Sequence, residues 1–225
     1  MKFRLTYLIL MIMMFALISG CGKKQDTETV QNTETAKVSD ENKQMLVKDL
    51  KDAFTGETTA SAKYAGYSQK AKEEGFDNIS KLFEATSKSE SVHASNHKAV
   101  LEKLGEKAPD VKPEFTVKTT KENLEDAIKG ETYEATTMYP GFKKLSDSMG
   151  DYGKDASQTF DYAMRTEAKH KVYYDESLKA IETKTTNELA SVFWICPVCG
   201  NTVTNESDIL KCSICKNENE KWTRV

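Results

Sequence analysis

Several residue types are scarce in this chain, and their scarcity narrows what the protein can be. It has only three histidines, four prolines and two tryptophans in 225 residues. Neither sign of charge dominates, because 32 lysines and arginines stand against 35 aspartates and glutamates, a formal net charge of −3. Without a basic excess we expect no nucleic-acid partner. Residues 40–189 also lack a convincing alternation of apolar and polar residues, which argues against a β-sheet there.

Cysteine is absent between residues 22 and 195, so the five cysteines fall into two groups. Cys21 follows a positively charged start, with Lys2 and Arg4, and the apolar stretch "LTYLILMIMMFALIS". This stretch is short for a membrane span and is typical of a signal peptide. The letters "ISGC" resemble a bacterial lipobox, which predicts cleavage and lipidation of Cys21; an uncleaved anchor or an ordinary signal peptide is the alternative. We therefore expect a lipid-anchored protein on the extracytoplasmic side of the cell membrane.

Residues 22–39 contain no aromatic residue and only two valines. Such a segment cannot bury enough apolar surface to fold, so we predict a flexible tether. A flexible chain of this length typically spans about 25 Å. The predicted domains are a signal peptide (1–20), a tether (21–39), a helical domain (40–189) and a small C-terminal domain (190–225).

Four stretches of the helical domain repeat apolar residues every three or four positions, the period of a helix with one buried face. They cover residues 46–71, 79–104, 124–145 and 156–181. Ser39 or Asp40 suits the start of the first helix and Gly75 its end, and Pro140 should bend the third helix. Between the second and third stretches, "GEKAPDVKPEFTVKTT" breaks the pattern with two prolines. The sequence therefore predicts an all-α four-helix bundle with a long crossover between helices 2 and 3.

Each of the four stretches is apolar at its ends and acidic in the middle. The first and third each place one glutamate there, and the second and fourth each place a Glu-x-x-His pair: Glu57, Glu131, Glu90 with His93, and Glu167 with His170. Buried carboxylates need a compensating positive charge, and these faces offer no lysine or arginine at that depth. Carboxylates with imidazoles and no thiolate suit iron or manganese. The same ligand set occurs in ferritin-like di-metal bundles.

The helical domain contains an internal repeat, since "AFTGETTASAKY" matches "AIKGETYEATTMY". In each copy a tyrosine follows the glutamate, Tyr64 seven residues after Glu57 and Tyr139 eight residues after Glu131. Glu134 has no counterpart in the first copy. We predict that Glu134 is a seventh metal ligand; the alternative is a supporting or surface carboxylate.

The C-terminal cysteines have the spacing C-x₂-C-x₁₂-C-x₂-C, at Cys196, Cys199, Cys212 and Cys215. Two such turns converge four thiolates on one tetrahedral ion. Gly200 follows the first pair, where a positive φ lets backbone amides point at sulfur. The spacing fits iron or zinc equally, and disulfides are the alternative for an exported protein.

Together these motifs resemble the rubrerythrin family. The stretches "GETTASAKY", "ESVHA", "NLEDAIKGETYEATTMYPGF" and "EAKH" resemble its bundle motifs, and "WICPVCG" with "CSIC" resembles its rubredoxin tail. The resemblance covers about residues 45–225. It implies a ferritin-like four-helix bundle followed by a small rubredoxin-like metal-knuckle domain.

The resemblance also implies how the site works. Two irons would be bound by Glu57, Glu90, His93, Glu131, Glu134, Glu167 and His170. Glu134 and His93 would exchange as ligands when the redox state changes, and Tyr64 and Tyr139 would hydrogen-bond to carboxylates. The expected activity is reduction of hydrogen peroxide to water, with electrons passing from the cysteine iron to the di-iron pair, usually between subunits of a head-to-tail homodimer. The electron donor stays unknown.

Four residues depart from the family pattern. Lys216 stands where the second cysteine turn usually has glycine, and we expect strain or an altered potential there. Asn201 and Val203 stand where aromatic residues are frequent. His97, one turn after His93, is interpreted as a core histidine or, alternatively, a ligand. Two other functions stay open from the sequence: a ferroxidase or iron-handling protein, and a non-enzymatic redox or metal-binding module whose cysteines hold zinc.

Overall fold

Every regular element within residues 40–189 is helical, as the lack of alternation predicted. The computed structural model describes residues 38–218 and 221–225. The long helices are α1 (Asp40–Glu73), α2 (Asp77–Lys103), α3 (Thr120–Tyr133), α4 (Tyr139–Ser148) and α5 (Lys154–Thr183). The short helical segments are η1 (Glu134–Met138), η2 (Gly150–Tyr152), η3 (Thr186–Glu188) and η4 (Glu206–Ile209).

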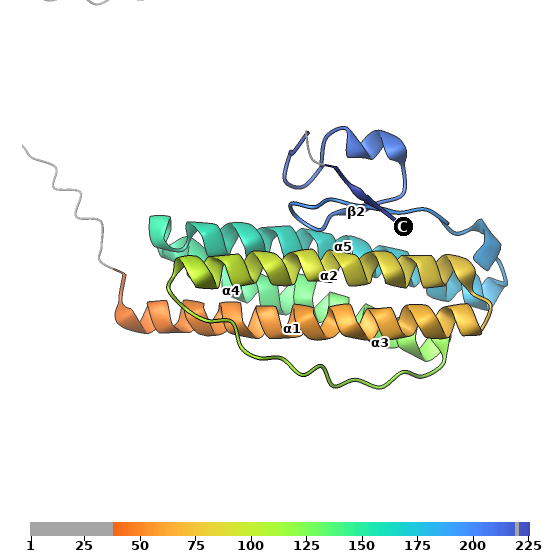
Figure 1. The fold of residues 1–225 in the computed structure, drawn as a ribbon, viewed down its shortest axis with the longest axis horizontal. Coiled ribbons are helices and arrows are strands. Elements are labelled where there is room, and N and C mark those ends of the chain that lie inside the picture. The colour runs from red at the N-terminus through yellow and green to blue at the C-terminus, as the bar shows by residue number, and fades with distance from the viewer. Residues whose placement is uncertain (1–37, 219–220) are drawn as a thin grey trace, which may run out of the picture. The chain divides into compact units, whose positions relative to one another are not determined.

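The helices form a four-helix bundle in which α1 packs along α2, and the run α3–η1–α4 packs along α5 (Figure 1). The segment between α2 and α3 runs along the outside of α1, which confirms the predicted crossover (Figure 1). The side chains of Val117 and Phe115 pack against α1 at Gly66. A Cβ added to Gly66 would lie 3.1 Å from Val117 and 3.2 Å from Phe115. A bare backbone at Gly66 therefore lets the crossover lie flat against the bundle.

The helix ends follow the capping signals in the sequence. The side chain of Ser39 accepts a hydrogen bond from the backbone N–H of Asn42 at the start of α1. Gly75 follows that helix with a φ of +83°, a conformation that glycine adopts without a Cβ penalty. Thr119 and Glu122 form a capping box at the start of α3. Local sequence alone therefore defines these helix ends.

Two apolar clusters fill the bundle on either side of a polar layer. One contains Leu46, Leu50, Tyr139 and Phe160, and the other Tyr64, Phe83, Leu124 and Tyr174. The glutamates and histidines of the Glu-x-x-His pairs lie between them, so the acidic middle predicted for each stripe is a real layer of the core. Burial of the two apolar ends stabilises the bundle and holds this layer in place.

The third helix changes type next to the predicted ligands. A π-helical segment, η1, separates α3 from α4, and the backbone N–H of Tyr139 donates to the carbonyl of Glu134, five residues back. A turn with i→i+5 bonds holds about one residue more than an α-turn. This accounts for the eight residues from Glu131 to Tyr139, against seven from Glu57 to Tyr64. Pro140, predicted to bend this helix, lies in the first turn of α4, directly after the π-segment.

The C-terminal segment forms a three-stranded antiparallel sheet with order β2-β1-β3, from β1 (Trp194–Ile195), β2 (Thr202–Val203) and β3 (Thr223–Arg224). Trp194 pairs with Val203 and with Arg224. Phe193 and Ile195 join the same apolar cluster as Tyr64 of the bundle. The small domain is therefore packed on the bundle through a shared core, and the predicted domain boundary at residues 189 and 190 stays a prediction.

The predicted signal peptide, the lipid site at Cys21 and the tether up to residue 37 lie outside the described residues. Among the helices of residues 38–218 and 221–225, none has the length and apolarity required to cross a bilayer.

Candidate metal centres

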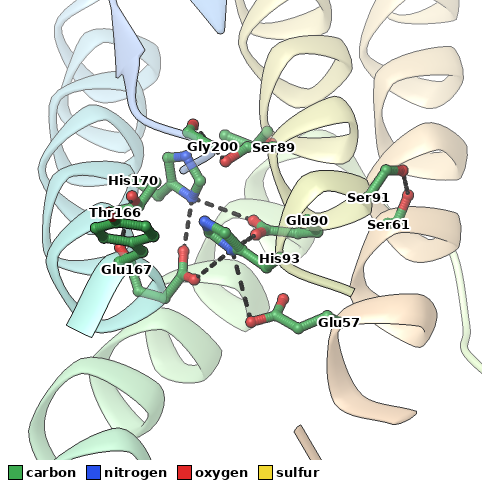
Figure 2. Close-up of polar contacts among 12 residues, drawn as sticks. Glu57, Ser61, Ser89, Glu90, Ser91, His93, Thr166, Glu167, His170 and Gly200 are labelled. Carbon is green, nitrogen blue, oxygen red and sulfur yellow. Dashed lines mark hydrogen bonds and ion pairs between the residues drawn. The ribbon is translucent and has the colours of Figure 1, made fainter. Parts of the chain in front are cut away.

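Six of the predicted ligands meet in the polar layer of the bundle. Each is at most 1% exposed: Glu57, Glu90, His93, Glu131, Glu167 and His170. They come from α1, α2, α3 and α5, and Figure 2 shows five of them pointing toward one another. Helical spacing explains this convergence, because Glu and His three residues apart share one helix face.

The donor atoms form two overlapping groups. One consists of Glu57, Glu90, His93 and Glu167, and the other of Glu90, Glu131, Glu167 and His170, with the donor atoms of each group within 4.8 Å of one another. Two glutamates, Glu90 and Glu167, belong to both groups. The geometry therefore describes two adjacent ion positions that share two carboxylates.

The shared carboxylates each face both positions. Glu90 places one oxygen 2.9 Å from His93 Nδ1 and the other 3.1 Å from His170 Nδ1. Glu167 likewise places one oxygen 2.9 Å from each of these nitrogens. Two ligands bound at about 2.1 Å and at right angles are about 3.0 Å apart. These separations therefore suit bridging carboxylates on two metal ions.

The chemistry of the donor atoms independently indicates metal ions. Eight buried atoms of this layer lack a hydrogen-bond partner: Glu57 Oε2, both carboxylate oxygens of Glu90 and Glu167, Glu131 Oε2, His93 Nδ1 and His170 Nδ1. Each unsatisfied buried polar atom costs about 1–3 kcal/mol. A protein tolerates so many in one layer only if something else satisfies them, and cations bound at the centre do so.

The pKa values of this layer also show that its buried carboxylates lack compensating positive charge. Burial and the nearby Glu167 raise the pKa of Glu57 to about 8. For His170, burial opposes protonation, but Glu90 and Glu167 outweigh it and raise the pKa to about 9. Without metal the cluster therefore retains protons, and metal ions would replace them.

The C-terminal domain holds both histidines by their far nitrogens. His93 Nε2 lies 3.1 Å from the backbone carbonyl oxygen of Cys199, and His170 Nε2 lies 3.1 Å from the hydroxyl of Thr202. Because a carbonyl oxygen only accepts, His93 donates from Nε2 and presents the lone pair of Nδ1 to the metal position. The first cysteine turn therefore fixes the tautomer of a bundle ligand.

Gly200 makes this close approach possible. Its φ is +76°, and an added Cβ would lie 2.4 Å from His93 Nε2 and 2.8 Å from Ser89 Oγ. The Ser89 hydroxyl donates to the Gly200 carbonyl at 2.7 Å, and Figure 2 shows both residues beside the histidines. Any larger residue would push the cysteine turn off the bundle.

The two tyrosines bind glutamates across the internal repeat. The Tyr64 hydroxyl donates to Glu131 Oε1 at 2.7 Å, and the Tyr139 hydroxyl donates to Glu57 Oε1. Each tyrosine thus occupies one oxygen of a glutamate from the other copy and leaves the second oxygen free. The π-turn of η1 keeps Tyr139 facing inward despite its extra residue.

The four C-terminal cysteines surround one point. The sulfurs of Cys196 and Cys215 are 3.7 Å apart, and those of Cys199 and Cys212 are 3.5 Å apart. Thiolates at about 2.3 Å from one tetrahedral ion are about 3.8 Å apart, whereas a disulfide is about 2.05 Å long. All four thiols are free, so the disulfide alternative is wrong.

A polar chain from α5 reaches the cysteine site through Asn201. This fully buried amide donates from Nδ2 toward the sulfur of Cys212 at 3.5 Å, and its oxygen accepts from Lys169 Nζ at 2.6 Å. Arg165, one turn earlier, donates to the carbonyls of Ser213 and Ile214. Asn201 therefore links a lysine of the bundle to the cysteine site.

Comparison of the sequence and the fold with known proteins identifies the chain's relatives. Residues 48–178 match the family described as Rubrerythrin. The chain belongs to the rubrerythrin family. Rubrerythrin-2 of Clostridium acetobutylicum is 35% identical over 175 residues, covering 77% of this chain and 92% of that protein. Nigerythrin of Nitratidesulfovibrio vulgaris is 31% identical over 179 residues, covering 79% and 85%. The solved structure of fully reduced, all-ferrous nigerythrin has a TM-score of 0.70 at 29% identity, covering 87% of this chain and 91% of that one.

Rubrerythrin-family membership agrees with both donor sets. The Glu/His layer of the bundle is the di-iron site of the family, and the four-cysteine cluster fits a rubredoxin-like iron site. The ferritin-like bundle and the metal knuckle expected from the sequence are both present.

Glu134 lies beside the rubrerythrin site but outside both donor groups. It begins the π-segment, and an added Cβ on Gly56 would lie 3.9 Å from its Oε1. Burial and the charge of Glu57 raise its pKa well above the usual range. Its role as a seventh ligand, and its exchange with His93, stay predictions.

Sequence reasoning missed the residues that connect the two centres. Ser89, Thr202 and Lys169 were not singled out, because each acts on a residue at least 32 positions away. Gly200 is the one available signal in the sequence. Its position predicts a positive φ in the cysteine turn, but the absence of a Cβ also makes room for His93 and Ser89. His97, by contrast, is in the core: its ring nitrogens face Tyr139 and Thr159, and it belongs to neither donor group.

Proposed function

We propose that this rubrerythrin-family protein is a peroxidase that reduces hydrogen peroxide to two waters, using two protons and two electrons per turnover. The observation that carries the proposal is the pair of ion positions sharing Glu90 and Glu167, joined to the cysteine site through His93 and Cys199. Glu90 and Glu167 would hold two irons side by side, and such a pair, when bound, would supply the two electrons that O–O cleavage requires. A one-electron cysteine iron can restore the pair in steps.

The residues contribute positions, charge and exclusion of water. Glu90 and Glu167 hold the two ion positions next to each other, and their charge favours the oxidised state. Tyr64 and Tyr139 hold a hydroxyl hydrogen at Glu131 and Glu57, where peroxide oxygens need protons. Because the layer is buried, reduced oxygen species stay out of bulk water.

The contacts support an electron route within one chain. The Cys199 thiolate and the Cys199 carbonyl belong to the same residue, and that carbonyl accepts from His93. Transfer between subunits of a head-to-tail homodimer is the second route that the family suggests. Mixing a Cys212→Ser variant with a Glu167→Gln variant separates the two, since activity returns in the mixture only if electrons cross between subunits.

Metal analysis and rapid mixing test the activity. We expect two irons in the bundle, one iron in the cysteine site and a visible thiolate-to-iron absorption. The reduced protein should be oxidised by peroxide much faster than by oxygen. A colourless cysteine site with zinc would exclude the electron relay, because zinc does not change valence. Faster oxidation by oxygen would favour the ferroxidase or iron-handling function instead.

Glu134 has a separate test. If Glu134 and His93 exchange as ligands, Glu134→Ala should retain both metals but slow peroxide turnover. The matched control is Glu125→Ala on α3, a surface glutamate away from the site. Unchanged turnover in Glu134→Ala would count against ligand exchange.

We also propose that the protein is lipid-anchored through Cys21 on the extracytoplasmic side of the membrane. The proposal is supported by the positive start, the apolar stretch and "ISGC" in the sequence. Cells expressing the full chain should incorporate labelled palmitate into it, and Cys21→Ser should abolish the label. Labelling that persists in Cys21→Ser would refute the anchor.

A further inference from the structure

His97 is a buried histidine that belongs to neither donor group. It lies one turn after His93 on α2 and is 0% exposed. Both ring nitrogens have partners, with Nε2 3.1 Å from the Tyr139 hydroxyl and Nδ1 3.3 Å from the Thr159 hydroxyl. A buried imidazole with two partners is held in one orientation, so it also constrains the hydroxyl of Tyr139.

Counting hydrogens gives the direction of each bond. Tyr139 has one hydroxyl hydrogen and donates it to Glu57, so its oxygen accepts from His97 Nε2. Burial lowers the pKa of His97 to about 3, so the ring is neutral near pH 7 and has a single N–H. Its Nδ1 is then the acceptor for Thr159. The result is a directed chain from Thr159 through His97 and Tyr139 to Glu57.

The internal repeat provides a comparison inside the same molecule. In the other half, Tyr64 donates to Glu131 at 2.7 Å. The position equivalent to His97 is Tyr174, one turn after His170, and its hydroxyl pairs with Thr86 at 2.6 Å. An imidazole therefore supports the tyrosine of one half-site, and a different pair occupies that place in the other.

We infer that His97 is a positioning residue that orients Glu57 for metal binding by holding the hydroxyl of Tyr139. Tyr139 holds Glu57 Oε1, the oxygen that lies 3.6 Å from His93 Nδ1 in the donor group, so its hydroxyl sets how the carboxylate faces the ion position. The inference rests on the proposed function only in that it concerns the same di-iron site. Loss of groups behind metal ligands weakens binding by about 10–100-fold. We expect the lower end of that range, in one half-site only.

The first experiment reads the tautomer of His97 in the unaltered chain. Two-bond proton–nitrogen NMR spectra of the zinc-loaded, full-length protein should contain three imidazole patterns, because the chain has three histidines. His97→Gln identifies the pattern of His97. We expect its hydrogen on Nε2 between pH 6 and 8. A hydrogen on Nδ1, or a charged ring, would overturn the inference.

The second experiment measures metal affinity in each half-site. Protein with zinc in the cysteine site is titrated with Co²⁺, and two stepwise constants are read from the absorbance. His97→Phe should weaken one constant about 10-fold and leave the other within about twofold. His97→Gln keeps an N–H donor at the same distance along the side chain and should stay near wild type. Equal loss in both variants would show that His97 only fills space.

A double-variant comparison tests whether the effect passes through Tyr139. His97→Phe should cause no further loss in a Tyr139→Phe background, and the full loss in a Tyr64→Phe background, which serves as the matched control. Equal losses in both backgrounds would overturn the inference. If His97→Phe does not fold, the tautomer measurement on the unaltered chain still decides. None of the three experiments uses peroxide, so failure here is distinct from failure of the peroxidase proposal.

Discussion

Gly200→Ala should detach the first cysteine turn from the bundle. The new Cβ would lie 2.4 Å from His93 Nε2, far inside normal contact, at a φ of +76°. The left-handed conformation alone costs a residue with a Cβ about 1–2 kcal/mol. Detachment also gives up the bonds from Ser89 to Gly200, His93 to Cys199 and His170 to Thr202, each about 1 kcal/mol. The three bonds account for about 3 kcal/mol of docking free energy, and the backbone strain brings the total cost of the substitution to about 4–5 kcal/mol.

Two spectroscopic signals separate the domains in this assay. Both tryptophans, Trp194 and Trp222, lie in the C-terminal domain, whereas the helical circular dichroism comes from the bundle. Urea unfolding of the zinc-loaded wild type should therefore give coincident transitions. In Gly200→Ala the fluorescence transition should move to lower urea and separate from the helical one.

Gly105→Ala is the matched control for backbone strain. Gly105 has a φ of +77°, but an added Cβ meets no atom within 4 Å. It should lose only the conformational cost of about 1–2 kcal/mol. If Gly200→Ala loses no more unfolding free energy than Gly105→Ala, the close contact with His93 does not exist in solution.

Three further predictions concern Lys216, Asn201 and the Glu/His layer without metal. Lys216 has a φ of +65°, so Lys216→Gly should raise the unfolding free energy of the C-terminal domain by up to about 1 kcal/mol; a loss of stability would show that its bond to Ser213 matters more. Asn201→Leu removes the amide donor at the Cys212 sulfur, so a redox titration should show a lower potential for the cysteine iron; an unchanged potential would refute that contact. Metal-free protein should lose stability as pH rises from about 4.5 to 9, because the pKa of Glu57 is raised from 4.5 to about 8 and that of His170 from 6.5 to about 9, so the folded state binds more protons than the unfolded chain across this range. Urea midpoints across this range should fall, and bound metal should remove the fall; a flat profile without metal would contradict these shifts.

The sequence predicted the bundle and the six residues of its two donor groups because the relevant information is local. Spacings of three and four residues place Glu90 with His93, and Glu167 with His170, on one helix face whatever the partner helices are. The cost of burying carboxylates then requires a metal wherever four such faces meet. The structure places these six side chains in two donor groups with shared glutamates.

The π-turn was less accessible from sequence. The spacing from Glu57 to Tyr64 is seven residues and that from Glu131 to Tyr139 is eight, which indicates one inserted residue. Such a residue can be accommodated by a bulge, a bend or a loop. Packing decided it: Tyr139 must reach Glu57 from the opposite helix, and an i→i+5 turn keeps it facing inward. The same turn places Glu134 beside Gly56, outside the donor groups.

By itself the sequence determined the helices, their buried faces and the chemistry of both metal sites, because periodicity, capping and ligand spacing act over a few residues. Only the tertiary structure decided which residues bring the two sites into contact. The contact between Cys199 and His93 joins residues 106 positions apart, and that between Ser89 and Gly200 joins residues 111 apart. No local pattern encodes such pairs; they arise because the shared apolar core around Ile195 and Tyr64 brings the cysteine turn to the histidines.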